Sequence, residues 1–243
     1  MNPQRSNPQY NFKEGALLLV DKPIGWTSFD VVNKIRYKLK HKLGVRKIKV
    51  GHAGTLDPLA TGLLIICTGK FTKKLDSLQG LYKTYTGTIK LGASTPSFDA
   101  ETEEKTGYPI DHINEELLEA ARPLFLGDIE QIPPIYSALK VDGERLYKQA
   151  RKGISVEIKA RPVHIYSFDI QLVEMPYLHF SIKCSKGTYI RSIANDFGKA
   201  LDSGAYLSSL RRTSIGEHSI DDAWNLEDLL VYIESMDIPP EED

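Results

Sequence analysis

The sequence lacks long apolar runs. Its longest apolar stretches, residues 16–20 and 63–67, are far shorter than the roughly 18 residues that a membrane-spanning helix needs. Residues 1–14 are rich in Asn, Gln and Pro and hold no apolar core of a secretory signal. We therefore expect a cytoplasmic protein with no membrane segment, and we interpret residues 1–14 as a flexible leader.

The motifs of several enzyme classes are also missing. The sequence has no phosphate-binding Gly-x-x-x-x-Gly-Lys loop and no Gly-x-Gly-x-x-Gly fingerprint after a strand, which argues against nucleotide hydrolysis and dinucleotide redox chemistry. It has neither a helix with paired histidines nor a Cys-x-x-Cys pair, so a zinc deaminase or metallonuclease is not expected. The two cysteines, Cys67 and Cys184, are interpreted as small buried hydrophobes. Any chemistry must then use ordinary side chains.

Charge is distributed unevenly, although the formal net charge is only −1. Between residues 31 and 75, eleven basic residues accompany a single acidic residue, Asp57. From residue 213 to the end there are ten acidic residues and no Lys or Arg. Either run is compatible with an ordinary solvated surface. The basic run is nevertheless informative, because a glycine-containing segment with the lone carboxylate interrupts it.

Hydrophobic periodicity predicts an α+β fold. The first part of the chain reads as a strand over 16–20, a basic amphipathic helix capped by Ser28, a loop over 51–62 and a buried strand over 63–67. Further helices are predicted over 71–78, 114–125, 143–152, 189–201 and 226–234, and further strands over 82–91, 178–184 and 208–215. Strands and helices do not alternate strictly, so we predict a mixed, largely antiparallel sheet flanked by helices.

Asp57 is the candidate reactive group on chemical grounds. A carboxylate in cationic surroundings is held ionised, and an ionised carboxylate can act as a nucleophile or a base. Asp before Pro in a loop is also a common turn residue, so the residue types alone leave both interpretations open.

Residues 51–64 read Gly-His-Ala-Gly-Thr-Leu-Asp-Pro-Leu-Ala-Thr-Gly-Leu-Leu. This segment closely resembles the catalytic loop of the bacterial tRNA pseudouridine-55 synthases, the TruB family. Five further segments resemble that family in the expected order: 19–23, 85–92, 131–140, 184–191 and 210–212. The chain is similar to a form that lacks the C-terminal PUA-type RNA-binding module, because it ends about thirty residues after Arg212.

The resemblance implies an isomerase with the pseudouridine synthase fold and a central catalytic cleft. A uridine in the T-loop of tRNA is flipped out, its glycosidic bond is broken, and the uracil is rejoined to the ribose through carbon. No cofactor and no metal is implied. The implied organisation is the leader over 1–14, a catalytic domain over 15–216 and a short acidic extension over 217–243.

The resemblance also implies roles for single residues. Asp57 is the essential carboxylate, acting on either the ribose or the base, and Arg191 pairs with it. Tyr85 stacks on the flipped uracil. Arg191 could also be an ordinary arginine on a helix surface, and Tyr85 could be an ordinary aromatic residue of the core.

Further residues of the implied site support or line it. His52 enters the space that the base leaves, and Tyr189 and Leu210 form walls of the pocket. Asp99 and Lys22 support the site. His52 is equally typical of a surface histidine, and the two wall residues are equally typical of a core.

The RNA itself is expected to lie along the basic helix and the segment that follows it. Such contacts with phosphates position a substrate without specifying its sequence. The residues expected to make them are Lys34, Lys38, Lys42, Arg46, Lys47 and Lys49. The expected partner is the tRNA T-arm, bound by a monomer with no obligate protein partner. A synthase for another RNA, or a non-catalytic RNA-binding or tRNA-folding protein, remains an alternative.

Overall fold

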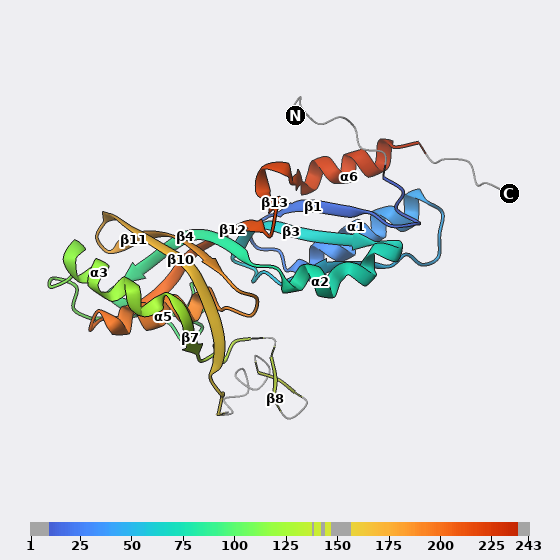
Figure 1. Ribbon diagram of the computed structural model, residues 1–243. Helices are drawn as coiled ribbons and strands as arrows, with labels where there is room; N and C mark the ends of the chain where they lie inside the picture. The colour runs from blue at the N-terminus through green and yellow to red at the C-terminus, as the bar shows by residue number, and fades with distance from the viewer. Residues whose placement is uncertain (1–9, 138, 142–143, 147–156, 238–243) are drawn as a thin grey trace. The chain divides into compact units, whose positions relative to one another are not determined.

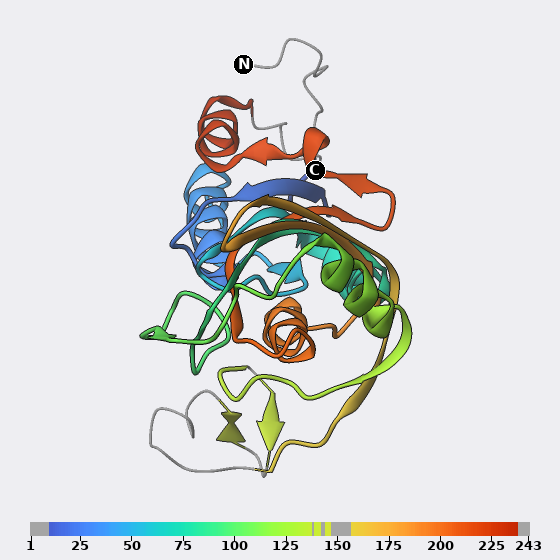
Figure 2. The same ribbon diagram turned by 90° about the vertical axis from the view of Figure 1, so that its left-hand side faces the viewer.

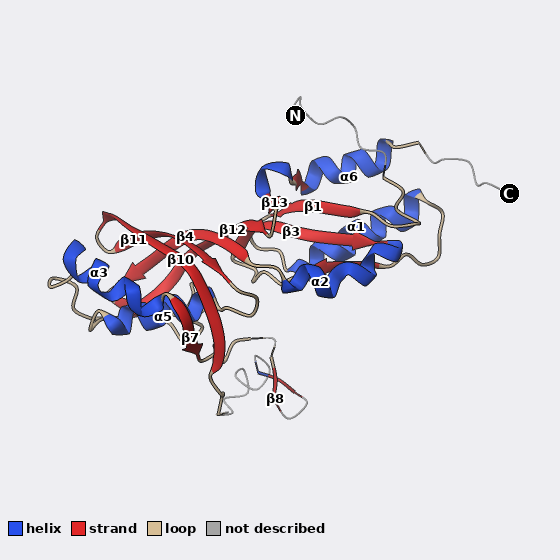
Figure 3. Ribbon diagram, viewed as in Figure 1, coloured by secondary structure: helices blue, strands red, loops and turns tan. Residues whose placement is uncertain are grey.

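A computed structural model describes residues 10–137, 139–141, 144–146 and 157–237 (Figure 1). The chain divides into two compact units. Unit 1 comprises residues 1–81 and 214–243, and unit 2 comprises residues 82–213. Each unit combines strands with helices, as Figure 3 shows by colour.

Unit 1 is built from both ends of the chain. Its elements are β1 (Leu17–Lys22), α1 (Ser28–Lys42), β2 (Val50–Ala53), β3 (Ala60–Thr68), η1 (Gly69–Lys74), α2 (Leu75–Gly80), β13 (His218–Ser219), η3 (Ile220–Asp222), β14 (Trp224–Asn225) and α6 (Leu226–Ser235). Strand β3 pairs antiparallel with both β1 and β2, and β14 pairs parallel with β1. The C-terminal segment therefore adds an edge strand beside the first strand of the chain.

The core of unit 1 is formed by the apolar faces of α1 and α6 against β1 and β3. Val31, Ile35 and Leu39 recur at helical spacing and are fully buried. Leu229 and Ile233 do the same on α6, which lies beside β1 in Figure 1. Phe12, within the predicted leader, is only 1% exposed and packs in this core, so the described part of the leader is tied to the unit.

Helix α1 begins with a capping box. The Thr27 side chain accepts from the Asp30 backbone N–H at 3.0 Å, and the Asp30 carboxylate accepts from the Thr27 N–H at 2.9 Å. The predicted cap at Ser28 is therefore wrong by one residue. Ser28 is buried inside the helix start, and its hydroxyl has another partner, described below.

Unit 2 is built around an antiparallel sheet. Its elements are β4 (Lys83–Leu91), β5 (Ala93–Ser94), β6 (Lys105–Thr106), α3 (Glu115–Ala121), η2 (Arg122–Phe125), β7 (Gly127–Gln131), β8 (Lys140–Val141), β9 (Glu144–Arg145), β10 (Arg161–Glu174), β11 (Tyr177–Cys184), α5 (Ile190–Ala200) and β12 (Ala205–Ile215), whose last two residues fall in unit 1. The strand order is β12, β4, β11, β10, β7.

Helices cover one side of this sheet. Figure 2 shows α3 and α5 on the same side of the strands of unit 2. Phe125, Phe168 and Phe197 pack edge to face there, with ring centroids 5.4–6.2 Å apart. The aromatic cluster joins η2, β10 and α5 and fixes the helix that carries Arg191.

The predicted α+β class with a mixed, largely antiparallel sheet is confirmed. The predicted loop over 51–62 is too long, because residues 50–53 form β2 and β3 begins at Ala60. Residues 144–145 of the helix predicted over 143–152 form β9, and 143 and 147–152 lie outside the described residues. Strand β10 was not predicted. None of the described helices is long and apolar enough to cross a membrane.

Candidate active site

Asp57 lies in the six-residue connection between β2 and β3, residues 54–59. Gly54, at φ 95°, takes the left-handed conformation at the start of this loop. The Ala60 N–H donates to the Asp57 carbonyl at 3.1 Å, which closes the loop just before β3. Asp57 itself is half-buried. Because the loop is short and joins two paired strands, the backbone position of Asp57 is fixed.

Ser28 holds the residue before Asp57. The Leu56 N–H donates to the Ser28 hydroxyl oxygen at 2.8 Å, and the Ser28 hydroxyl donates back to the Leu56 carbonyl at 3.2 Å. Leu56 is 3% exposed, so both bonds lie away from water, where such pairs hold most firmly. The start of α1 therefore fixes one side of the loop.

Lys22 and Gly25 hold the residue after Asp57. Lys22 is fully buried, and its ammonium donates to the carbonyls of Pro23 (2.9 Å), Trp26 (2.6 Å) and Pro58 (3.3 Å). The Gly25 N–H also donates to the Pro58 carbonyl, at 2.8 Å. A buried ammonium needs such acceptors for its three donors. Lys22 thus joins the turn after β1 to the Asp57 loop.

His52 lies on β2, five residues before Asp57 and opposite Ile66 of β3. Its side chain is half-buried. The strand pairing fixes the backbone of this histidine, so the predicted insertion residue and the predicted carboxylate rise from one hairpin. Lys22, His52 and Asp57 are all members of unit 1.

Arg191 is the best-anchored predicted site residue of unit 2. It lies in the first turn of α5 and is 4% exposed. Its guanidinium donates to the carbonyls of Ser97 (3.1 Å) and Tyr136 (3.0 Å), and its Nε lies 3.5 Å from a carboxylate oxygen of Asp99. Arg191 is therefore a buried cation held in a fixed plane, not a helix-surface arginine.

Asp99 is buried beside Arg191, with 5% exposure. Its other carboxylate oxygen accepts from the Ser97 hydroxyl at 2.6 Å and from the Glu101 N–H at 3.0 Å. A buried ion pair is tolerable when hydrogen bonds satisfy the rest of both groups. The structure brings Asp99 and Arg191 together. Ser97, which hydrogen-bonds to both, was not predicted from the sequence.

Tyr85, Tyr189 and Leu210 lie on three elements of unit 2. Tyr85 is on β4 and 8% exposed, Tyr189 precedes α5 as its N-cap residue, and Leu210 is half-buried on β12. The backbone of Tyr189 is clamped by the Gln131 amide, which accepts at 2.7 Å and donates at 3.1 Å. Gln131 is a second positioning residue that sequence reasoning missed.

Asp57 and Arg191 belong to different units. Their predicted pairing, and the cleft that would hold it, therefore stay predictions.

Lys83 is a buried cation near the predicted stacking residue. It is 6% exposed and lies two residues before Tyr85, so both side chains are on the same face of β4. Burial, together with the positive charges of Arg212 and Lys186, lowers the pKa of Lys83 to about 8, against an opposing effect of Cys184. Burial likewise raises the pKa of the Cys184 thiol to about 11. The only sequence signal for Lys83 was its inward position in an alternating strand.

The basic face of α1 is partly occupied by the C-terminal helix. The Lys38 ammonium lies 2.9 Å from the Glu234 carboxylate, and the Lys42 ammonium donates to the Glu234 carbonyl at 2.8 Å. These contacts lower the pKa of Glu234. Lys34, Arg46, Lys47 and Lys49 are exposed. Of the six residues predicted to contact phosphates, two are therefore engaged with Glu234 and four are exposed.

No three His, Cys, Asp or Glu side chains gather as metal ligands among the residues that the structure describes.

Comparison with known proteins identifies close relatives. The family profile described as TruB family pseudouridylate synthase (N terminal domain) matches residues 40–190. A tRNA pseudouridine synthase B of Flavobacterium johnsoniae is 54% identical over 93% of this chain and 97% of the relative. The tRNA pseudouridine synthase B of Chloroherpeton thalassium is 52% identical over 90% of this chain and 91% of the relative.

Solved structures with a similar fold are found at lower sequence identity. A chain in the crystal structure of a Cbf5-Nop10-Gar1 complex is 28% identical, with a TM-score of 0.67 over 91% of this chain. A chain in an H/ACA RNP bound to a substrate RNA containing 2'-deoxyuridine is 27% identical, with a TM-score of 0.65. This chain spans 55% and 54% of those two chains.

Proposed function

This chain belongs to the TruB family of pseudouridylate synthases, and on that basis we propose that it converts uridine 55 in the T-loop of tRNA to pseudouridine. The relatives that match almost end to end carry the name tRNA pseudouridine synthase B. The observation that carries the proposal for the site is the fastening of the Asp57 loop on both sides, at Leu56 by Ser28 and at Pro58 by Lys22.

A fastened loop suits a reactive carboxylate. Catalytic groups work when their own supports hold them close to the productive geometry before substrate arrives. In this reaction the carbon–nitrogen glycosidic bond breaks, the uracil turns, and a carbon–carbon bond to the same ribose forms. One proton leaves the base carbon and one is gained at the freed nitrogen, so nothing is oxidised or reduced. Asp57 acts either as a nucleophile or as a base, and both routes need it ionised.

The flipped base needs a pocket and a cation nearby. Extruding a base costs a few kcal/mol of stacking, which Tyr85 offsets by stacking worth about 1–3 kcal/mol per base. Arg191 is proposed as the partner of Asp57, because a guanidinium already aligned by Asp99 loses little freedom on pairing. His52 fills the vacated place in the RNA, and Tyr189 and Leu210 wall the uracil.

The test is incubation of the purified protein with an unmodified tRNA transcript, with EDTA present and no cofactor added. Pseudouridine is then mapped by carbodiimide modification and primer extension. We expect a single modified site at position 55, and none in a transcript with cytidine at that position. Binding without product, or product only at another position, would overturn the proposal.

A further inference from the structure

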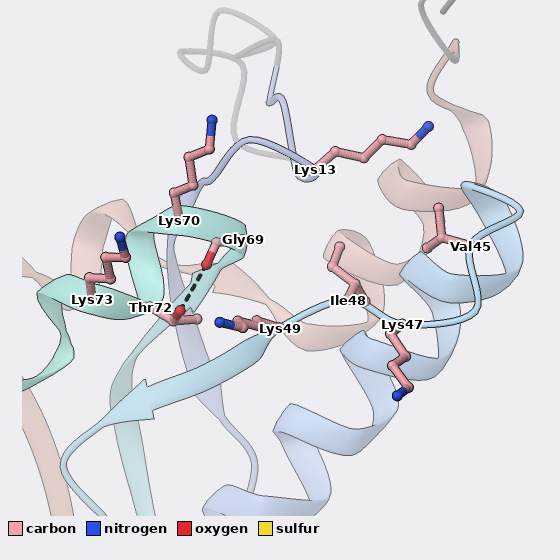
Figure 4. Close-up of a pocket in the computed structure, with 9 residues that line it drawn as sticks. All are labelled: Lys13, Val45, Lys47, Ile48, Lys49, Gly69, Lys70, Thr72 and Lys73. Carbon is pink, nitrogen blue, oxygen red and sulfur yellow. Dashed lines mark hydrogen bonds between the residues drawn. The ribbon is translucent and has the colours of Figure 1, made fainter.

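A pocket of about 560 Å³ in unit 1 is lined by nine residues, of which five are lysines and none is acidic (Figure 4). The lining comes from three segments that are distant in sequence: the N-terminal segment, the connection from α1 to β2, and η1. The lysines are Lys13, Lys47, Lys49, Lys70 and Lys73. We call this site the lysine pocket.

Main-chain hydrogen bonds around Gly69 hold the three segments together. The Gly69 N–H donates to the Lys49 carbonyl at 2.9 Å, and the Lys70 N–H donates to the Glu14 carbonyl at 2.8 Å. Gly69 has φ +50°, and a Cβ there would come within 2.5 Å of the Lys13 carbonyl oxygen. The backbone therefore fixes the convergence of the three segments that carry the lysines.

The fold brings lysines from three segments to this pocket, and in Figure 4 the amines of Lys13 and Lys47 point outward from it. In Figure 4, Lys70 and Lys73 project from η1 on the same side, and the Lys49 amine points towards Thr72. Glu14 pairs with Lys70, but both side chains are mostly exposed, with 62% and 73% exposure, and such pairs contribute little. A pocket with this excess of positive charge attracts a polyanion.

The chemistry of the lining favours phosphates over bases. Beyond the lysines, the nine lining residues are Val45, Ile48, Gly69 and Thr72, with no aromatic ring for a base to stack on. Lysine amines on flexible stems bind phosphate as point charges, without sequence preference. We propose that the lysine pocket binds backbone phosphates in the stem of the RNA substrate, an inference that rests on the proposed tRNA function.

The pocket lies at the far end of the hairpin that carries Asp57. Asp57 precedes the first residue of β3, whereas Gly69 follows its last residue. The nine residues of β3 are joined by eight steps of about 3.3 Å, so the two ends of the strand lie roughly 26 Å apart. At about 3.4 Å per base pair, the rise of B-form DNA, this corresponds to roughly eight base pairs, and the shorter rise of an A-form RNA stem raises that number slightly. The lysine pocket therefore contacts the RNA well away from the flipped base.

This placement refines the phosphate contacts expected from the sequence. Lys38 and Lys42 of α1 are engaged by Glu234, while Lys47 and Lys49 join lysines from two other segments. The main phosphate contact of unit 1 is the lysine pocket.

The test compares two charge-matched double variants. The pocket variant is Lys49→Gln with Lys73→Gln, and the control is Lys105→Gln with Lys199→Gln, two exposed lysines of unit 2. Binding of full-length tRNA is measured over a range of salt concentrations, with circular dichroism to verify folding. The pocket variant should bind roughly tenfold more weakly, and its log K against log salt slope should be shallower by about 1–2. The control should match the wild type.

A second arm varies the RNA. Hairpins with a stem of about three base pairs fall short of the pocket and should bind both variants equally, whereas stems of about twelve base pairs should show the full difference. Equal weakening by pocket and control variants, or a deficit that persists with the shortest hairpin, would overturn the inference. If the wild type makes no pseudouridine yet shows the stem-dependent pocket effect, the proposed reaction fails and the phosphate site stands. If the wild type makes pseudouridine normally but the pocket variant binds like the control, the proposed reaction stands and the phosphate site fails.

Discussion

At the scale of single residues, the fold has to offset the free-energy cost of removing charged side chains from water. Lys22 is fully buried and matched by three carbonyls, and Arg191 is matched by two carbonyls and Asp99. Lys83 is a third buried cation, and burial lowers its pKa to about 8. A group that gives up its proton more readily in the folded state than in the unfolded state costs stability while it is charged.

Lys83 therefore predicts a specific dependence of stability on pH. Between about pH 8 and the unfolded pKa near 10.4, the unfolded chain binds more protons at this site than the folded chain, so the free energy of unfolding should rise with pH by up to about 3 kcal/mol from this residue. Below pH 8 the contribution should be flat.

The variant Lys83→Met isolates this effect. The difference in free energy of unfolding between variant and wild type, measured in urea from pH 7 to pH 10, should favour the variant at pH 7 and shrink as the pH rises. A difference that is constant over this range would show that Lys83 titrates normally in the folded state.

Ser28 joins two elements that are far apart in sequence, the start of α1 and the loop before β3. Substitution Ser28→Ala removes both hydrogen bonds to Leu56 and leaves a buried N–H and carbonyl without this partner. We expect a loss of about 1–3 kcal/mol of stability. We also expect a fall in the single-turnover rate at saturating tRNA, because Asp57 is the next residue.

The neighbouring substitution Thr27→Ala is the matched control. It removes the α1 cap, at a cost of about 1 kcal/mol, but leaves the bonds to Leu56 intact. Comparable rate losses in the two variants would mean that the rate follows overall stability, and the role of Ser28 in positioning the loop would be rejected.

Elements with regular burial were predictable from sequence. The alternation of Leu178, Phe180 and Ile182 predicted β11, and the helical spacing of Val32, Ile35 and Leu39 predicted α1. Strand β10 was missed because register shifts in its pairing with β11 interrupt its alternation. Strand β2 was missed because Gly51 and His52 look like loop residues, and only pairing with β3 makes them a strand.

The candidate site also has parts that the sequence could indicate and parts that it could not. Asp57 and its loop could be proposed from the sequence because the motif is continuous. The supports of that loop and of Tyr189 were not, because Ser28 lies 28 residues from Leu56 and Gln131 lies 58 residues from Tyr189. Side-chain clamps over such separations leave no local pattern. The fold alone reveals them.

At the scale of the whole molecule, the uneven charge of the chain has a structural counterpart. The acidic C-terminal segment is not remote from the basic N-terminal one, because α6 and α1 share one core and Glu234 contacts Lys38. The lysines of the α1–β2 connection and η1 instead gather at the lysine pocket. A chain with a net charge near zero can thus carry a locally positive surface that suits a polyanion.

The central claim is that the Asp57 carboxylate performs the isomerisation, and its most direct test is the Asp57→Asn variant in a single-turnover assay with unmodified tRNA. Because the amide keeps the size of the side chain but cannot act as nucleophile or base, thermal unfolding and tRNA affinity should stay close to wild type. Pseudouridine formation should fall by at least about a thousandfold. Turnover at a rate comparable to that of the wild type would contradict the account.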